Sequence, residues 1–401
     1  MQHLPGGDMQ SAQAPRFGRR LLLGGATALA GITAATPLTR TTGPGQARAT
    51  EQPAPSAVVV AEDWQDFARR FITPEGRVVD SGNQGISHSE GQGTGLLFAL
   101  RFGDRARFER ILAWTRGTLR RPHDTLLAWR YQPGAATPVA DLNNASDGDL
   151  LVAWALADAA ERWSSGEWRS LAAEMARDLL RRAVLPRPEG AMLLPGAEGF
   201  LKVDHLVVNP SYFVLPAFRT LARVAPSPIW RELEAGGIAL AETARFGRWR
   251  LPADWVALPR GAGRPAPAPG WPPRFSDDAL RVPLNLVWAG QAQHAAVRAA
   301  VAFWTDPGHR VMPAWVDLRT GLAAPYAGDA GQEAVARLAF AASVGNRRDS
   351  ALPAVADAVH YYPAAITLMA RLAWQDLGLS APLVPGCAKQ AAVMSARRRD
   401  A

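Results

Sequence analysis

The hydrophobic positions along most of the chain recur with the period of an α-helix. From about residue 57 onward, apolar residues at i, i+3 and i+4 spacing predict helices over 57–71, 93–102, 105–119, 148–162, 168–183, 208–224, 229–245, 283–304, 331–344 and 362–376. In the fourth of these, Leu150, Ala153, Trp154, Ala157 and Ala160 share one face. Strand-like alternation is scarce. The pattern therefore predicts a large all-α domain.

Turn-rich stretches separate the predicted helices at 186–199, 259–273 and 305–328. The second is the richest in Pro and Gly, but helical pairs flank it on both sides, so we expect a surface loop and not a domain linker. Ten to twelve helices in antiparallel pairs fit either a barrel of helical hairpins or an α-solenoid. The sequence shows no repeat of fixed length, which disfavours the solenoid. Periodicity alone does not select the barrel.

The first 50 residues have the pattern of a signal peptide of the twin-arginine type, followed by a spacer. Arg19 and Arg20 precede an apolar stretch that is too short and too rich in glycine for a comfortable membrane span. An A-x-A cleavage site stands at 47–49, and an earlier cut near Ala35 stays open. We expect a periplasmic or secreted protein with no stable membrane insertion after cleavage. An uncleaved anchor is the alternative, and residues 381–401 read as a C-terminal tail.

The positive charge of the chain does not indicate nucleic-acid binding. The formal net charge is +8, but five Arg and one Asp in residues 1–50 account for half of it. Lys202 and Lys389 are the only lysines, and the remaining arginines are spread thinly, apart from a terminal run at 397–399. No basic strip with interleaved aromatic residues is present, so a nucleic-acid partner is not expected.

Cysteine and tryptophan usage narrows the function classes further. The single Cys387 excludes a disulfide framework and a zinc site built from cysteine pairs. The chain contains 14 Trp against 5 Tyr, and indole rings stack well on the apolar faces of sugars. For any one tryptophan, a place in the hydrophobic core is the more common explanation.

Three acidic residues stand at predicted helix starts, in loops rich in Gly, Ser and Asn: Glu90, Asp147 and Asp278. Ser89 and Gln92 have the spacing of a capping box, which places Glu90 in the first turn of its helix. Taken singly, each acid is also explained by the ordinary preference for carboxylates at helix N-termini. A helix N-terminus lowers a carboxyl pKa, whereas a general acid needs a raised one. Glu90 therefore needs burial or a neighbouring carboxylate, for which Asp147 is the candidate.

Read together, these segments resemble glycoside hydrolase family 8, and especially the endoglucanases of bacterial cellulose-synthesis operons. The resemblance rests on GRVVDSGN at 76–83 with SHSEGQG at 87–93, ASDGD at 145–149, and WPPRF at 271–275 with DALRVPL at 278–284. Shorter matches are LAWR at 127–130, NPSY at 209–212, FGRWRLP at 246–252 and YY at 361–362. The similarity covers roughly residues 60–375 in the expected order.

The resemblance implies an (α/α)6 barrel of six inner and six outer helices over 57–380, with a cleft across its mouth. It implies an endo-β-1,4-glucanase that inverts the anomeric configuration, with Glu90 as general acid, Asp278 as base and Asp147 holding the sugar at the cleavage subsite. It implies sugar contacts or support from Trp129, Asn144, Tyr212, Arg281 and Tyr361. No metal or organic cofactor is needed. The expected partner is a β-1,4-glucan, with a functional link to the cellulose synthase complex.

Two positions depart from the family pattern. Asp277 replaces an aromatic residue before the base, and Thr94 replaces an aromatic residue in the glycine-rich run. These changes put efficiency and subsite preference in question, and not the reaction. Chitosan, xylan and mixed-linkage β-glucan stay open as substrates. A cationic chitosan chain favours an acidic cleft, whereas the net charge of the mature chain is positive. A non-catalytic glucan-binding accessory protein would predict the loss of a carboxylate, yet all three are present.

Overall fold

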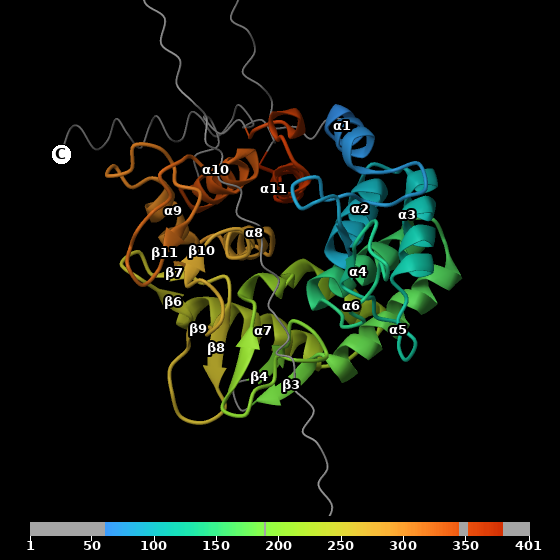
Figure 1. Ribbon diagram of the computed structural model, residues 1–401, viewed down its shortest axis with the longest axis horizontal. Helices are drawn as coiled ribbons and strands as arrows, with labels where there is room; N and C mark the ends of the chain where they lie inside the picture. The colour runs from blue at the N-terminus through green and yellow to red at the C-terminus, as the bar shows by residue number, and fades with distance from the viewer. Residues whose placement is uncertain (1–60, 188–189, 345–351, 380–401) are drawn as a thin grey trace, which may run out of the picture. The chain divides into compact units, whose positions relative to one another are not determined.

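Helices build most of the structure. The computed structural model describes residues 61–187, 190–344 and 352–379, so the expected leader at 1–50 and the tail at 381–401 lie outside the described residues (Figure 1). Within the described residues the helices are α1 (Ala61–Phe71), α2 (Ser89–Arg101), α3 (Arg105–Thr118), α4 (Ser146–Arg162), α5 (Gly166–Arg182), α6 (Leu215–Val224), α7 (Ile229–Thr243), α8 (Arg281–Trp288), α9 (Ala295–Trp304), α10 (Ala330–Val344) and α11 (Tyr361–Asp376).

The helices form an inner ring and an outer layer. The inner helices α2, α4, α6, α8, α10 and α11 contact one another in succession, and α4 is buried without a break from Ser146 to Ala157. The outer helices α1, α3, α5, α7 and α9 bury one face each; α1, for example, buries Trp64, Phe67 and Phe71. A helix that is buried all round belongs inside and an amphipathic one outside, so the patterns of α4 and α1 match their layers.

The chain passes once around the molecule, so its last helix meets its first. Figure 1 shows the red α11 beside the blue α1, and these helices pack directly on each other. A buried ion pair of 2.9 Å between Arg371 of α11 and Asp63 of α1 joins them. Between α10 and α11, the described residues hold the short 3-10 helix η2 (Val355–Asp357), so five outer helices are described where six are expected.

Two helix predictions differ from the structure. The stretch 283–304 is divided into α8 and α9, because Gly290 adopts a positive φ of +84°. The backbone N–H groups of Gly290 and Gln291 then donate to the carbonyls of Val287 and Leu286, which ends α8. In the stretch 208–224, the α-helix begins only at Leu215. It is preceded by the strand β5 (His205–Val208) and the 3-10 helix η1 (Pro210–Tyr212). Here tertiary pairing of β5 overrides the helical period of the sequence.

Short antiparallel strands occupy the loops between helices. The pairs are β1 (Ser87–His88) with β2 (Arg130–Tyr131), β3 (Val184–Arg187) with β4 (Gly190–Leu193), β6 (Arg245–Phe246) with β7 (Leu251–Pro252), and β10 (Arg274–Phe275) with β11 (Val316–Asp317). A three-stranded sheet runs β5, β8 (Val256–Pro259), β9 (Ala266–Pro267). Because β9 pairs with β8, the loop at 259–273 folds back onto the domain, as expected of a surface loop.

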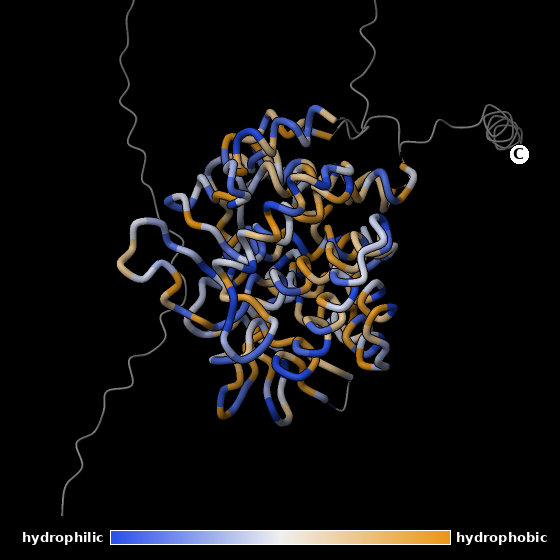
Figure 2. Tube along the Cα trace, turned by 90° about the vertical axis from the view of Figure 1, so that its right-hand side faces the viewer, coloured by the Kyte–Doolittle hydropathy of each residue, from blue (hydrophilic) through white to orange (hydrophobic). Residues whose placement is uncertain are grey.

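The core takes up part of the tryptophan content. Trp64, Trp230 and Trp374 are among the largest fully buried side chains, so core packing accounts for them. The alternation of hydrophobic and hydrophilic residues along the helices can be followed in Figure 2. In the part of the chain that the structure describes, no helix has the length and apolar character needed to cross a membrane.

Candidate active site

The first turns of α2 and α4 touch through a glycine. A Cβ atom on Gly148 would lie 2.2 Å from Ser89 Oγ and 2.6 Å from the backbone nitrogen of Glu90. One turn further along, a Cβ on Gly93 would lie 2.6 Å from Leu151 Cβ. Such close backbone approach requires glycine. The contact brings Glu90 on α2 and Asp147 on α4, which are distant in sequence, to the same end of the ring.

The start of α2 differs in one detail from the sequence prediction. Glu90 lies in the first turn, as expected, but the N-cap is His88, whose Nδ1 accepts a 2.9 Å hydrogen bond from the backbone N–H of Gly91. The capping box of Ser89 and Gln92 is wrong, because the amide of Gln92 is turned into the interior. There it accepts from Val78 N at 2.6 Å and donates to the hydroxyl of Thr115 at 2.8 Å.

Arg281 at the start of α8 joins the second and third acids. One guanidinium nitrogen lies 3.0 Å from Asp147 Oδ2, and the other lies 2.7 Å from Asp278 Oδ1. Arg281 is buried, and its positive charge also lowers the pKa of Glu90. The planar, two-pronged guanidinium suits such bridging between carboxylates. Glu90, Asp147 and Asp278 therefore share one cation and lie at one site.

Asp278 is held at both carboxylate oxygens. Arg281 binds Oδ1, and the indole N–H of Trp255 donates to Oδ2 at 3.1 Å. The turn that carries Asp278 is fixed by a further buried carboxylate, Asp254. Its Oδ1 accepts the backbone N–H groups of Ser276 at 3.0 Å and Ala279 at 2.8 Å, and Oδ2 accepts the Ser276 hydroxyl. Burial, and after it the charge of Asp278, raises the pKa of Asp254 to about 7.

Burial acts differently on the two acids at the α2–α4 contact. Burial raises the pKa of Asp147 to about 6, against the lowering effect of Arg281 and with the help of the charge on Glu90. Burial also raises the pKa of Glu90, but the hydrogen bond and charge of His88, 3.1 Å away, outweigh it and leave that pKa below its ordinary value. The sequence analysis required a raised pKa for Glu90. In the structure the raised pKa is that of Asp147, whereas His88 keeps the pKa of Glu90 low.

Aromatic rings line the approach to Asp278. The ring of Trp255 is stacked on that of Trp271, with centroids 5.0 Å apart and planes inclined by 19°. The Trp255 ring also stacks against the ring of Phe200, with centroids 5.9 Å apart, and the ring of Tyr212 packs edge-on against it at 63°. Flat apolar rings next to carboxylates are a surface that suits pyranose rings with polar edges.

Comparison with known proteins places this geometry in a family. The family model for glycosyl hydrolases family 8 matches residues 49–376. The chain belongs to glycosyl hydrolases family 8. A probable endoglucanase from Novacetimonas hansenii is 42% identical over 80% of this chain and 92% of the relative. An endoglucanase from Cellulomonas uda is 39% identical over 71% of this chain and 79% of its own length.

Solved structures of family 8 enzymes confirm the expected fold. The endo-β-1,4-glucanase CMCax from Acetobacter xylinum is 41% identical and superposes with a TM-score of 0.74 over 80% of this chain and 99% of that one. A family 8 endoglucanase from Klebsiella pneumoniae gives a TM-score of 0.73 at 38% identity, over 79% of this chain and 99% of its own. The protein is therefore a glycoside hydrolase with the predicted all-α (α/α)6 barrel.

Of the five residues predicted to bind or support substrate, Arg281 and Tyr212 lie directly at the acidic cluster. The Arg281 guanidinium stands 5.6 Å from the centroid of the Tyr212 ring. Trp129 is half-buried; its carbonyl accepts the Ser89 N–H at 3.1 Å, and its indole donates to Asp141 at 2.7 Å. The ring of Trp129 is thus anchored beside the start of α2.

Asn144 and Tyr361 are placed differently. Asn144 is buried, donates to Asp149 Oδ2 at 2.8 Å and accepts the N–H of Ala197 at 2.7 Å, so both ends of its amide bind protein groups. Tyr361 is fully buried, with its ring 5.7 Å from that of His88. Their predicted sugar contacts stay predictions, since the Asn144 amide is bound to protein groups and the Tyr361 ring is buried.

The two departures from the family pattern have separate surroundings. Thr94 Oγ1 lies 3.5 Å from Glu90 Oε1, so the shorter side chain still reaches the acid. Asp277 binds other partners than Asp278 does: its carboxylate lies 3.4 Å from the amide of Gln332, and its carbonyl accepts the hydroxyl of Tyr362. Desolvation of its carboxylate, followed by the charges of Asp329 and Asp278, raises its pKa to about 6. Asp277 therefore does not take the place of Asp278.

Sequence reasoning missed His88, Trp255 and Asp254. His88 and Asp254 stand within or next to the matching segments, but nothing in their spacing identifies their partners. Trp255 could have been suspected only from the general richness in tryptophan.

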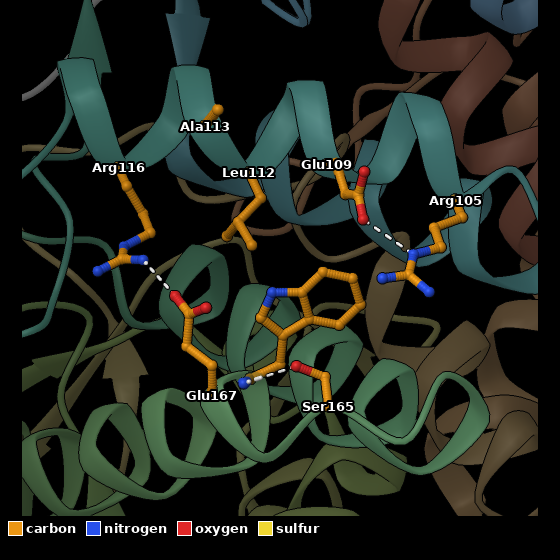
Figure 3. Close-up of a pocket in the computed structure, with 8 residues that line it drawn as sticks. Arg105, Glu109, Leu112, Ala113, Arg116, Ser165 and Glu167 are labelled. Carbon is orange, nitrogen blue, oxygen red and sulfur yellow. Dashed lines mark hydrogen bonds and ion pairs between the residues drawn. The ribbon is translucent and has the colours of Figure 1, made fainter.

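A surface hollow of about 380 Å³ lies elsewhere, between α3 and α5 (Figure 3). Its charged groups bind one another, Arg105 to Glu109 at 2.8 Å and Arg116 to Glu167 at 3.4 Å. Trp168, which also lines the hollow, is only 7% exposed. With its ring covered and its ions paired, this hollow offers nothing to a sugar.

Proposed function

We propose that the protein is an endo-β-1,4-glucanase that hydrolyses internal bonds of cellulose-like glucans with inversion. The observation that carries the proposal is the bridge from Arg281 to Asp147 and Asp278, beside the touching first turns that carry Glu90 and Asp147. Two acids on opposite sides of a scissile bond are what inverting hydrolysis requires. Relatives that share about two fifths of their residues with this chain are named endoglucanases.

In the proposed mechanism Asp278 is the general base. Arg281 and Trp255 hold its two oxygens, which fixes the direction from which it removes a proton from water. The water attacks the anomeric carbon, while Glu90 protonates the departing oxygen on the other face. Asp147 accepts a sugar hydroxyl at the cleavage subsite and supports the distorted ring. Arg281 keeps both Asp147 and Asp278 in place.

Other substrates are less well supported. A xylose-complexed enzyme and a β-1,3-1,4-glucanase, both from Paenibacillus, share the fold at 18% and 15% identity, which carries no information on substrate for this chain. A non-catalytic binding role does not explain why three carboxylates converge.

The test is substrate-resolved hydrolysis by the purified protein. Reducing-sugar release is measured from carboxymethylcellulose, mixed-linkage β-glucan, xylan and chitosan. We expect the highest rate on a β-1,4-glucan, and a loss of at least about 10³-fold in Glu90→Gln and in Asp278→Asn. Asp277→Asn is the matched control, since this neighbouring carboxylate is bound by neither Arg281 nor Trp255, and it should keep most of the activity. Faster release from xylan or chitosan, or equal activity in Glu90→Gln, would contradict the proposal.

We further propose that the enzyme is exported and works on glucan in the periplasm or outside the cell, in support of cellulose synthesis. The support is the leader, with Arg19 and Arg20 before a short apolar stretch. Replacing both by lysine should retain the protein in the cytoplasm, as followed by fractionation. Normal export of the double variant would contradict a twin-arginine signal. A role in cellulose synthesis predicts altered cellulose yield when the active enzyme is replaced by Glu90→Gln.

A further inference from the structure

His88 stands between two carboxylates at the entrance of α2. Its Nδ1 lies 3.1 Å from Glu90 Oε2, and its Nε2 lies 3.5 Å from Asp80 Oδ2. Its ring is half-buried, with the ring of Tyr361 from α11 edge-on at 5.7 Å. Besides Asp80, the charged groups that act on His88 and Glu90 are Arg281, from α8, and Asp147, from α4.

The Nδ1 atom of His88 has two partners that make opposite demands. The backbone N–H of Gly91 donates to it at 2.9 Å, which requires a lone pair on Nδ1. An ionised Glu90 at 3.1 Å requires a proton on the same atom. Both groups can donate to the single lone pair of Nδ1 only when the proton is on Glu90 and His88 is neutral. When the proton is on Nδ1, the N–H of Gly91 loses its acceptor.

The pair therefore shares one proton along the line from Nδ1 to Oε2, and each of the two positions has a partner that favours it. Asp80 favours the proton on the imidazole, because its negative charge stabilises the cationic ring. The N-cap bond from Gly91 favours the proton on Glu90. In the free protein the first effect prevails. Burial opposes protonation of His88, but its bonds to Asp80 and Glu90 raise its pKa to about 10.

This inference rests on the role of Glu90 proposed above. We propose that His88 is a positioning residue that holds on Nδ1 the proton that Glu90 delivers to the glycosidic oxygen. The proton moves from Nδ1 to Glu90 Oε2. This leaves a neutral imidazole whose Nδ1 accepts the backbone N–H of Gly91. Glu90 then gives it to the leaving oxygen, which keeps the electron pair of the broken C–O bond. The attacking water forms the new bond to the anomeric carbon and gives its proton to Asp278.

After turnover, solvent takes the proton from Asp278 and returns one to His88, so the cycle balances with one water consumed. This arrangement explains how Glu90 acts as an acid although its pKa in the free protein is lowered. The ionised state of Glu90 is the resting state of a pair that still contains the proton needed for catalysis. The pair loses that proton only when His88 itself deprotonates.

The test is the alkaline limb of the pH profile of kcat/KM in His88→Asn. Asparagine is among the best N-caps, so this variant keeps an acceptor for the N–H of Gly91. Its side-chain amide does not titrate, so it has no proton to transfer to Glu90. We expect the alkaline limb to move to lower pH by at least about one unit, because the acid is then lost at the pKa of Glu90 alone. Asp80→Asn should move the limb in the same direction by less. The acid limb, set by the base, should stay in place.

Two results would overturn the inference. If His88 only caps α2, the limb keeps its position in His88→Asn. If His88 only suppresses the protonation of Glu90, its removal moves the limb to higher pH.

A second measurement uses a cello-oligosaccharide with a 2,4-dinitrophenyl leaving group, which departs without protonation. His88→Asn should lose about 10²-fold in kcat/KM on the natural oligosaccharide and no more than about threefold on the dinitrophenyl substrate. Equal losses on both would also overturn it.

The proposed function is tested separately by the same samples. If the wild-type protein cleaves β-1,4-glucan and Glu90→Gln does not, the function stands, whatever the result for His88. If the wild-type protein cleaves no glucan, or Glu90→Gln remains active, the proposed function fails first.

Discussion

Replacing Gly148 by alanine should reduce both stability and activity, because this residue sets the distance between the helices that carry Glu90 and Asp147. The added Cβ would lie 2.2 Å from Ser89 Oγ and 2.6 Å from the nitrogen of Glu90. The hydroxyl can rotate, but the backbone nitrogen cannot. Restoring an ordinary carbon–nitrogen separation requires the two helix ends to part by about 1 Å.

The size of both effects follows from that displacement. Overpacking of this kind costs about 1–3 kcal/mol in the free energy of unfolding. A shift of about 1 Å between catalytic groups costs roughly 10²-fold in rate. We expect kcat on a cello-oligosaccharide to fall by about that factor, with a smaller change in KM, because substrate contacts away from the α2–α4 junction are unchanged.

Gly117→Ala is the matched control. Gly117 lies in α3, and a Cβ there would have no atom within 4 Å. Since alanine favours helix over glycine, the control should gain up to about 1 kcal/mol in the free energy of unfolding and keep its activity. Denaturant unfolding and steady-state kinetics measure both variants. Wild-type stability and kcat in Gly148→Ala would refute the close contact on which the site depends.

Three further predictions concern the buried polar groups. Arg281→Lys should lose at least about 10²-fold in kcat, because an ammonium group cannot bridge Asp147 and Asp278 as the guanidinium does; steady-state kinetics with unchanged circular dichroism measures this. Trp255→Phe keeps the ring but removes the donor to Asp278, so kcat should fall about tenfold with little change in stability. Burial raises the pKa of Asp149 to about 7, so its bound proton stabilises the fold fully below about pH 4, and this contribution is lost as the pH rises through 7. In Asp149→Asn, the fall in the free energy of unfolding between pH 4 and 7 should be smaller, by up to about 1.4 kcal/mol per pH unit; an unchanged slope would contradict this assignment.

The inner helices explain why so much of the fold could be predicted from the sequence. A helix such as α4 has apolar residues at helical spacing along its length, so its presence was predicted, and its start at Ser146 lies two residues before the predicted one. The sequence did not reveal the division at Gly290, because apolar residues continue the helical period across it. The strand β5 was also missed, since its partner β8 lies some fifty residues further along the chain.

The site was predictable in its acids and not in the groups that bind them. Glu90, Asp147 and Asp278 stand in motifs with recognisable spacing. The partners of these acids depend on the tertiary structure: His88 reaches both Asp80 and Glu90 only because of the turn before α2. Asp254 holds the base loop through backbone N–H groups, which carry no sequence signal. The family resemblance also placed Asn144 on the substrate, whereas its neighbours in space turn its amide inward.

The anomer formed first from a cello-oligosaccharide tests the account most directly. Three acids arranged around Arg281 should act as one acid and one base, with water attacking opposite the leaving group. Proton NMR of the reaction in its first minutes should show the α-anomer appearing before mutarotation produces the β-anomer, and Glu90→Gln should show neither. If the β-anomer appears first, the enzyme retains configuration and the roles assigned to Asp278 and Glu90 are wrong.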